Sequence, residues 1–418
     1  MSNMVKLIPV AIFLLVAAGV LALEQRHIEF VQTVAAQTAN NSTSPRATGE
    51  RTVSPQLAGK DIKNGLYIVD SNQGQLSSRV LLIDPQDKRV LKTFNAGLQP
   101  DIAVSPDGTR LYLAFTEYQP DRMDKLQVID TSSGAVLQTV ENPERWLGTA
   151  PRYASKMAIS SDGRRLYIYK DHQTTKGDFY YLATFDTEKG KFLPETVALP
   201  GCLSAILVPL AEEGRINVLC TGMGDVRFLN VSESGAAAVS RIPLRQSVAK
   251  SHGRNIGYVI PSRDGQRLAV VMGDGTFYNI DNKDRKVLRT GEIQNEAPAG
   301  AKVAIPDGLI ERWIGVQPST VSVDGSEAYV GVGYLENLRK GNRSFDEVAV
   351  LDTQNLKIRR VLQTSRPITA LYRSKEGRYL YGLAQDDDSI LVIDTATGGQ
   401  VDVISGLVRT PTLLVNAP

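Results

Sequence analysis

The sequence predicts an all-β protein, a seven-bladed β-propeller closed by pairing its N- and C-terminal strands, and three observations lead to this fold. An apolar strand that ends in Asp or Asn at a polar turn occurs seven times, first over residues 80–84. An acidic-Gly turn, as at Asp107-Gly108, occurs six times. The mismatch between seven and six indicates that one unit is cut, with its two pieces at the ends of the chain. Such a repeat predicts a ring of small sheets.

Each repeat unit contains four strands, which we call A to D in chain order. Asp and Asn suit the C–D turn because their side chains hydrogen-bond the backbone two residues on, and Gly supplies the positive φ of the A–B turn. Residues 412–416 form an A strand and residues 66–70 a B strand, so joining the termini completes the seventh unit and removes the free edges of an open array. The predicted blades are 66–94 with 411–416, 101–140, 155–197, 202–242, 256–290, 317–363 and 368–404.

The N-terminal residues predict export. An uncharged run over 7–23 follows Lys6, and its length is at the short end for a transmembrane helix. Charged residues follow it instead of a small-residue cleavage site. We interpret 1–23 as a signal anchor that stays uncleaved, with a cleaved signal peptide as the alternative, 24–60 as a flexible stalk and 61–418 as the propeller. We therefore expect an extracytoplasmic protein, periplasmic or at the cell surface, tethered to the membrane through residues 7–23.

Charge and cysteine content limit the possible partners. The 47 basic and 45 acidic residues give a net charge of +2, which gives no reason to expect nucleic acid as a partner. Cys202 opens a predicted A strand and Cys220 ends the B strand of the same hairpin. Positions related in this way about a turn bring the Cα atoms near the separation that a disulfide needs. In an exported domain, a bridge is favoured over two thiols.

The predicted topology sorts the connections onto two faces. The A–B and C–D turns are short and lie on one face, whereas the D–A and B–C connections vary greatly in length and lie on the other, which we call the loop face. Aromatic and arginine side chains carry much of the energy of protein interfaces, so we expect a partner or ligand face here; alternatively, the tryptophans only fill gaps between blades. The predicted face residues are Tyr118, Arg145, Trp146, Arg152, Tyr153, His172, His252, Arg254, Arg312, Trp313, Tyr334 and Arg366.

The residue pattern predicts neither a catalytic nor a metal centre in this chain. His172 and His252 are far apart in sequence, and CxxC, HExxH and GxSxG spacings do not occur. The carboxylate run 386–388 is better explained by a hairpin tip than by a calcium site. A propeller hydrolase of the lactonase type needs carboxylates and amides around the central tunnel. The A-strand starts offer Asp101 but mostly Ile, Ser, Cys and Thr, so we rank this class last.

The repeats with VID, SPDG and LYL resemble the YVTN-type seven-bladed propellers. Residues 66–71 (LYIVDS) followed by 78–80 (SRV) are similar to the opening blade of the heavy subunit of the quinone-dependent amine dehydrogenases. Cys202 and Cys220 are similar to that family's cysteine pair within one blade. The resemblance covers about 66–416. Of the family's Trp-x-Pro-Gly-Gly stretch, only Trp313 is matched.

The resemblance implies a non-catalytic subunit. In that family the redox cofactor, a tryptophan-derived quinone, is built in a separate small subunit. This chain would then hold no cofactor of its own and would dock a small catalytic subunit or another exported protein. As an enzyme it would be the non-catalytic part of an amine dehydrogenase, an oxidoreductase. The alternative is a stand-alone YVTN-type binding or surface propeller without enzymatic activity.

Overall fold

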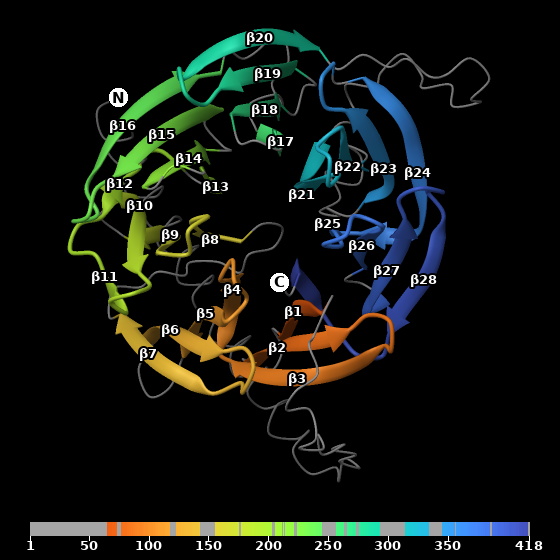
Figure 1. The fold of residues 1–418 in the computed structure, drawn as a ribbon, viewed down its shortest axis with the longest axis horizontal. Helices are drawn as coiled ribbons and strands as arrows, with labels where there is room; N and C mark the ends of the chain where they lie inside the picture. Colours follow the sequence, from red (N-terminus) through yellow and green to blue (C-terminus); the bar gives the residue numbers. More distant parts are fainter. Residues whose placement is uncertain are drawn as a thin grey trace, which may run out of the picture. The chain divides into compact units, whose positions relative to one another are not determined.

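In the computed structural model, seven antiparallel sheets form a ring (Figure 1). The chain divides into two units, residues 1–54 and 55–418, and the sheets belong to the second. The structure describes residues 65–72, 77–117, 123–142, 155–174, 177–202, 205–210, 212, 214–220, 224–244, 256–262, 266–272, 276–292, 314–333, 345–355, 357–384 and 387–416. The predicted anchor (1–23) and stalk (24–60) lie outside these residues. Within them, no helix long and apolar enough to span a membrane is found.

Each sheet is one blade, with its strands in order from the centre of the ring to the rim (Figure 1). From the centre outward, blade 1 is β29 (Pro411–Asn416), β1 (Leu66–Asn72), β2 (Ser77–Asp84) and β3 (Arg89–Ala96), and blade 2 is β4 (Leu98–Val104), β5 (Arg110–Glu117), β6 (Met123–Asp130) and β7 (Val136–Asn142). Blade 3 is β8 (Met157–Ile159), β9 (Arg165–Thr174) and β10 (Gly177–Asp186), with β11 (Lys191–Phe192) and β12 (Val197–Ala198), and blade 4 is β13 (Ala205–Pro209), β14 (Arg215–Cys220), β15 (Asp225–Val231) and β16 (Ala237–Pro243).

The remaining three blades follow the same order: blade 5 is β17 (Ile256–Pro261), β18 (Arg267–Met272), β19 (Thr276–Asp281) and β20 (Lys286–Glu292); blade 6 is β21 (Ile314–Val321), β22 (Glu327–Gly333), β23 (Phe345–Asp352) and β24 (Ile358–Ile368); blade 7 is β25 (Ala370–Arg373), β26 (Tyr379–Ala384), β27 (Ser389–Asp394) and β28 (Gln400–Ser405).

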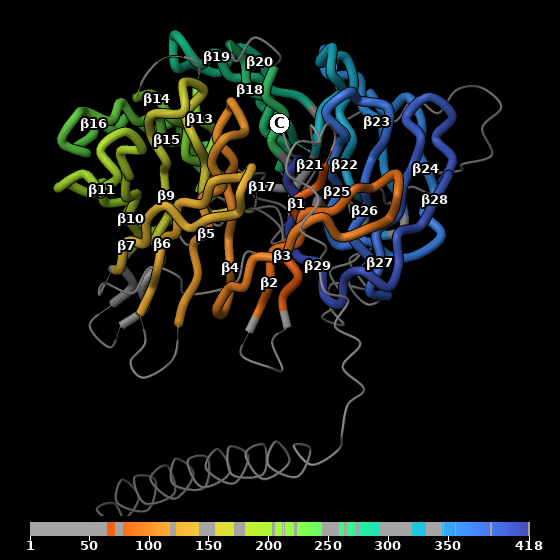
Figure 2. The backbone as a smooth tube through the Cα atoms, turned by 60° about the horizontal axis from the view of Figure 1, so that its bottom comes forward, coloured from red at the N-terminus to blue at the C-terminus, as the bar shows by residue number. Residues whose placement is uncertain are grey.

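The predicted seven blades and the predicted closure are both confirmed. The last strand, β29, pairs antiparallel with the first, β1, so that Leu66 lies opposite Asn416. Asn416 Nδ2 also donates to the Arg373 carbonyl of β25 in blade 7 (2.7 Å). The closing strand is therefore bonded both to its own blade and to the neighbouring blade. Figure 2 shows β1 and β29 side by side between the strands of blades 2 and 7.

The fourth strand of blade 3 departs from the repeat pattern. It is split into β11 and β12, because Pro194 lies between them and has no N–H group to continue the ladder. The next residue, Glu195, instead donates its N–H to the Ser234 carbonyl in blade 4 (2.9 Å). A Cβ on Gly235, whose φ is +97°, would lie 2.2 Å from the Glu195 carbonyl oxygen, so this contact between the blades requires glycine.

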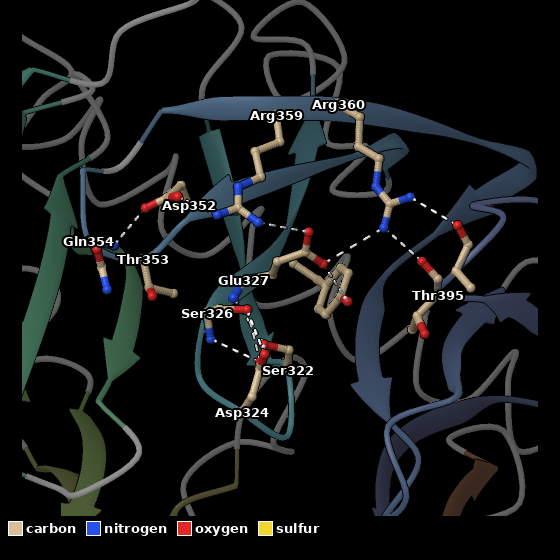
Figure 3. A network of polar contacts seen from close by, with 12 residues as sticks. Ser322, Asp324, Ser326, Glu327, Asp352, Thr353, Gln354, Arg359, Arg360 and Thr395 are labelled. Atoms are coloured by element: carbon tan, nitrogen blue, oxygen red, sulfur yellow. Dashed lines mark hydrogen bonds and ion pairs between the residues drawn. The ribbon is translucent and has the colours of Figure 1, made fainter.

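The A–B and C–D turns form a turn face that a repeated hydrogen-bond pattern stabilises. In blade 2, Ser105 Oγ accepts from Arg110 N (2.9 Å) and donates to Asp107 (2.6 Å). Thr131 Oγ1 donates to the Gly108 carbonyl (2.6 Å), which links the C–D turn to the A–B turn. Figure 3 shows the bonds of Ser322 and Ser326 to Asp324 in the corresponding A–B turn of blade 6. The serine bond recurs at Ser160, Ser262, Ser322 and Ser374, and the threonine bond at Thr187, Thr353 and Thr395.

Neighbouring blades are joined by apolar clusters and by polar contacts at the rim. Seven buried apolar clusters occur among the described residues, one for each pair of neighbouring blades. At the rim, side chains of one blade reach the C–D turn of the next: Lys92 Nζ donates to the Thr131 carbonyl (3.0 Å) and Arg360 Nη2 to the Thr395 carbonyl (2.7 Å) (Figure 3). Lys88 Nζ in the C–D turn of blade 1 donates to Asp402 of β28 in blade 7 (2.6 Å), which is the equivalent contact between these two blades.

Candidate functional site

Three buried aspartates hold the D–A connections of the loop face. Asp70 is near the end of β1, Asp101 is the middle residue of β4, and Asp225 begins β15. Asp101 and Asp225 are fully buried, and Asp70 is 3% exposed. Burying a carboxylate is costly unless protein donors replace the lost water. The protein donors around each aspartate therefore fix the adjacent connection of the loop face.

Asp70 holds the connection that leads into β29. Its Oδ1 accepts the N–H groups of Arg409 (2.8 Å) and Thr410 (2.7 Å), and its Oδ2 accepts from Arg79 Nε (2.7 Å). Arg79 Nη2 in turn donates to the Leu407 carbonyl (3.2 Å). One carboxylate and its arginine thus restrain both backbone donors and a backbone acceptor of the same connection.

Asp225 holds the connection that leads into β13 through an ion pair. Arg227 Nε lies 3.3 Å from Asp225 Oδ1, and Arg241 pairs with Oδ2. Arg227 Nη2 donates to the Pro200 carbonyl (2.8 Å), so the ion pair orients an arginine that grips the connection. Both Asp225 and Arg227 are buried, and such pairs are tolerated only when their remaining hydrogen-bonding groups are satisfied.

The predicted disulfide is confirmed and fastens the same connection. Cys202 and Cys220 are bonded, with Cα atoms 4.9 Å apart, and both residues are fully buried. The Cys202 carbonyl also accepts the hydroxyl of Tyr169 from blade 3. We call Tyr169, Cys202, Cys220, Asp225 and Arg227 the blade 3–4 clasp. The disulfide and the Arg227 bond, oriented by the Asp225 ion pair, fix the connection to blade 4, and the Tyr169 bond ties the same connection to blade 3.

Asp101 holds the end of the connection that leads into β8, and it does so without an arginine. Its Oδ2 accepts Lys156 N (2.6 Å) and its Oδ1 accepts Ile102 N (2.8 Å). Burial raises the pKa of the Asp101 carboxyl to about 6, against the opposing effects of the Ser155 hydroxyl, the two backbone N–H groups and the Lys156 charge. Among the ion pairs of the described residues, none includes Asp101. The Lys156 ammonium group lies 6.0 Å from the centre of the Tyr169 ring.

Of the predicted face residues, Arg366 is the one whose side chain the structure describes. It lies in β24, its Nη1 is 3.4 Å from Ser389 Oγ and its Nε is 3.9 Å from Asp387 Oδ2, both in blade 7. His172 lies in β9, with its backbone opposite Phe179 of β10. The other predicted face residues, Tyr118, Arg145, Trp146, Arg152, Tyr153, His252, Arg254, Arg312, Trp313 and Tyr334, lie outside the described residues.

Sequence reasoning assigned no role to Asp70 or Asp225, and it considered Asp101 only as a possible hydrolase residue. A weak signal existed, because charged residues at positions 225 and 227 lie in and at the start of a strand whose other residues are mostly apolar. In the part of the chain that the structure describes, no group of three or more His, Cys, Asp or Glu side chains is placed to hold a metal ion. The described residues instead form a set of side chains that anchor the D–A connections of the loop face.

Comparison with known proteins adds the fold class. No protein-family model and no curated protein matches the chain. A periplasmic gluconolactonase from Pseudomonas aeruginosa matches with a TM-score of 0.59 and 14% identity, over 85% of this chain and 99% of that one. A putative 6-phosphogluconolactonase from Bacteroides fragilis has a TM-score of 0.58 and 13% identity, over 86% and 99%. The dihydro-heme d1 dehydrogenase NirN has a TM-score of 0.53 and 14% identity, over 84% and 66%.

These likenesses define the class of protein, a seven-bladed β-propeller. At such identities they show a shared fold and no shared chemistry, because one fold hosts many unrelated functions. The similar structures named here are lactonase-like and heme d1 propellers, not amine dehydrogenases. The likeness to the amine dehydrogenase heavy subunit therefore rests on the sequence motifs alone.

Proposed function

We propose that this chain is an exported, membrane-tethered scaffold whose loop face docks a redox partner, such as a quinone-bearing small subunit. The observation that carries the proposal is the anchoring of three D–A connections by Asp70, Asp101 and the blade 3–4 clasp. A surface whose loops are already fixed loses less conformational entropy when a partner binds. Binding residues are also disproportionately found on loops that a rigid scaffold positions.

Two further observations support the placement of the docking site on the loop face and an exported partner. The turn face uses its serine, threonine and aspartate side chains for its own hydrogen bonds, as at Ser105, Asp107 and Thr131, so the loop face is the better candidate for docking. The disulfide between Cys202 and Cys220 is typical of oxidising compartments outside the cytosol. The redox nature of the partner follows from the motifs similar to the amine dehydrogenase heavy subunit.

Co-purification tests this proposal. The full-length chain is isolated from its native membranes in mild detergent, and the bound proteins are identified by mass spectrometry. We expect a small exported chain to co-purify and the complex to reduce a dye when an amine is supplied. Isolation of the chain alone, without amine-dependent dye reduction, would contradict the redox proposal and leave the stand-alone binding propeller.

A matched pair of variants tests where the partner docks. Arg227→Met removes the donor to the Pro200 carbonyl at the loop face, whereas Lys286→Ala changes an exposed ion pair with Asp284 in the C–D turn of blade 5. We expect the first substitution to weaken partner recovery and the second to leave it unchanged. Equal loss with both variants, or loss only with Lys286→Ala, would place the docking site elsewhere.

Lactone hydrolysis is the second candidate, because two of the similar structures are named as lactonases. A propeller hydrolase of the lactonase type needs a carboxylate at the central tunnel, and Asp101 is the candidate for it. Asp101 is, however, fully buried and already accepts two backbone N–H groups. A gluconolactone assay with the wild-type chain and with Asp101→Asn decides the matter. Hydrolysis above the spontaneous rate that Asp101→Asn abolishes would favour a lactonase over the docking scaffold.

A further inference from the structure

The D–A connection between β28 and β29, residues 406–410, is fixed along its backbone. Asp70 Oδ1 accepts the Arg409 N–H group (2.8 Å), and Arg79 Nη2 donates to the Leu407 carbonyl (3.2 Å). The backbone of Arg409 is therefore held in place before any partner binds. A side chain that contacts a partner from a fixed backbone loses less conformational entropy on binding.

The side chains of this connection alternate between the core and solvent. Val408 is 3% exposed and packs into the apolar cluster between blades 7 and 1, whereas the next residue, Arg409, is exposed. A Cβ added to Gly406 would meet no atom within 4 Å, so the space beside the start of the connection is open. The Arg409 side chain is thus presented to solvent at the loop face.

The guanidinium group of Arg409 has no partner within the protein. Of the arginines in the described residues, Arg409 and Arg267 are the two whose side chains make no hydrogen bond, ion pair or ring contact. The others bind a carboxylate, a hydroxyl, a backbone carbonyl or a ring, as Arg165 binds the Val231 carbonyl and Arg289 lies over the Phe277 ring. An unpaired guanidinium keeps all five of its N–H donors for a ligand.

Arg79 adds a second guanidinium group at the same connection. Its Nε donates to Asp70 Oδ2 (2.7 Å), while the Arg409 N–H group is bound to the other oxygen of that carboxylate. The Asp70 side chain is 3% exposed and the Arg79 side chain 39% exposed. Arginine stays protonated at any pH that a protein meets. Two arginines and one carboxylate therefore leave one positive charge uncompensated here, and it is on the exposed side.

We propose that Arg409, supported by Arg79, is the docking contact for an aspartate or glutamate side chain of an exported protein partner. The planar guanidinium group offers two parallel N–H groups that match the two oxygens of a carboxylate. Arginine is also enriched among the few residues that carry most of the binding energy of an interface. The inference rests on the proposed docking at the loop face, and it names the contact residue and the charge that the partner must supply.

A carboxylate fits this place better than a lipid surface does. Anionic lipid headgroups are recognised by clusters of about 4–8 basic residues. Here two arginines, Arg79 and Arg409, lie at one connection, and one of them is already paired with the buried Asp70. The arrangement therefore suits a single anionic side chain of a protein.

Binding of a fluorescent hexaglutamate peptide to the full-length chain in mild detergent tests the site. Fluorescence anisotropy at low salt gives the affinity. We expect Arg409→Ala to weaken binding about tenfold, the effect of losing a charge-assisted hydrogen-bonded contact. Arg409→Lys should weaken it less, because an ammonium group keeps the charge but not the paired N–H groups. The difference should shrink in about 1 M salt, where charges are screened beyond about 3 Å.

Arg267→Ala is the matched control. Arg267 is exposed and its side chain is equally unpaired, but it begins β18 at the turn face. Both substitutions keep the backbone bonds, from Arg409 N to Asp70 and from Arg267 N to Ser262 Oγ, so both variants should melt with the wild-type protein. We expect Arg267→Ala to bind the peptide as the wild-type protein does. An equal loss with both variants would show unspecific attraction and overturn the site.

Three further outcomes are decisive. Absence of peptide binding to the wild-type protein, or wild-type affinity in Arg409→Ala, would overturn the proposal. Arg409-dependent binding to phosphatidylglycerol vesicles without Arg409-dependent binding to the peptide would assign the site to lipid instead. Co-purification decides the docking scaffold separately: a chain that binds the peptide through Arg409 but is isolated without a partner contradicts the scaffold and leaves the carboxylate site standing.

Discussion

Cys220 and Asp225 lie directly opposite each other where β14 pairs with β15. Cys220 is bonded to Cys202, and Asp225 orients Arg227 toward the Pro200 carbonyl, so two neighbouring strands hold one connection at points two residues apart. A covalent bond and a buried ion pair thus act on the same short segment. Their separate contributions to stability can be measured, because each can be removed without the other.

Removal of the disulfide should lower the stability of the propeller. Replacing Cys202 and Cys220 together with alanine frees a loop of 18 residues in the unfolded chain, which corresponds to about 3 kcal/mol. We expect a lower melting temperature by circular dichroism, and the same shift for the reduced wild-type protein. A double variant with the same melting temperature as the oxidised wild-type protein would show that the disulfide adds no stability.

Arg227→Met should destabilise the protein by about 3 kcal/mol, because it leaves a buried carboxylate short of one partner. Arg241 still reaches Asp225, which keeps the loss at the lower end for a broken buried pair. The control is Arg359→Met on blade 6, where half-exposed Arg359 pairs with Asp352 and Glu327 (Figure 3). Such pairs contribute about 1 kcal/mol or less. Denaturant unfolding that ranks the two losses in reverse would contradict this assignment.

Asp101 should make the stability of the folded protein rise as the pH falls. Its pKa of about 6 in the folded protein exceeds the ordinary value of 3.8 for this side chain. The folded state therefore binds the proton first, and the resulting stability is fully present below pH 3.8 and lost as the pH rises through 6. A shift of this size corresponds to about 3 kcal/mol.

Comparison with Asp101→Asn isolates this contribution to stability. Other carboxylates of the turn face, such as Asp107 and Asp324, have pKa values held low by serine hydroxyls, so they destabilise the wild-type protein and the variant alike at acid pH. We expect the difference in unfolding free energy between the two proteins to change by up to about 3 kcal/mol between neutral pH and about pH 4. A difference independent of pH would show that Asp101 does not titrate in this range.

Gly235→Ala should disrupt the contact of blade 4 with Glu195, which lies between β11 and β12 of blade 3. A Cβ there would lie 2.2 Å from the Glu195 carbonyl oxygen, and the φ of +97° disfavours any other residue. We expect a loss of about 1–3 kcal/mol. Gly399→Ala is the matched control, because its Cβ would meet only Thr397 Oγ1 at 3.5 Å. Equal melting temperatures for the two variants would contradict the close contact between the blades.

Much of the fold could be predicted because its signals are local and repeated. The Asp84 type of C–D turn and the Asp107-Gly108 type of A–B turn are fixed by side-chain hydrogen bonds and by positive φ within a few residues. Counting them was enough to find the cut unit, whose strands β1 and β29 pair as expected. The disulfide could be predicted as well, because both cysteines lie in one hairpin.

The role of the buried aspartates could not be predicted in this way. Asp70 contacts Arg409 and Thr410 across more than 300 residues of sequence, and Asp101 contacts Lys156 across 55. No local pattern distinguishes these carboxylates from those of the exposed turns, because their burial is created by the packing of neighbouring blades. By itself the sequence determined the blade count, the closure and the cysteine pair. Only the tertiary structure decided which charges are buried, because burial and pairing depend on residues that the ring brings together.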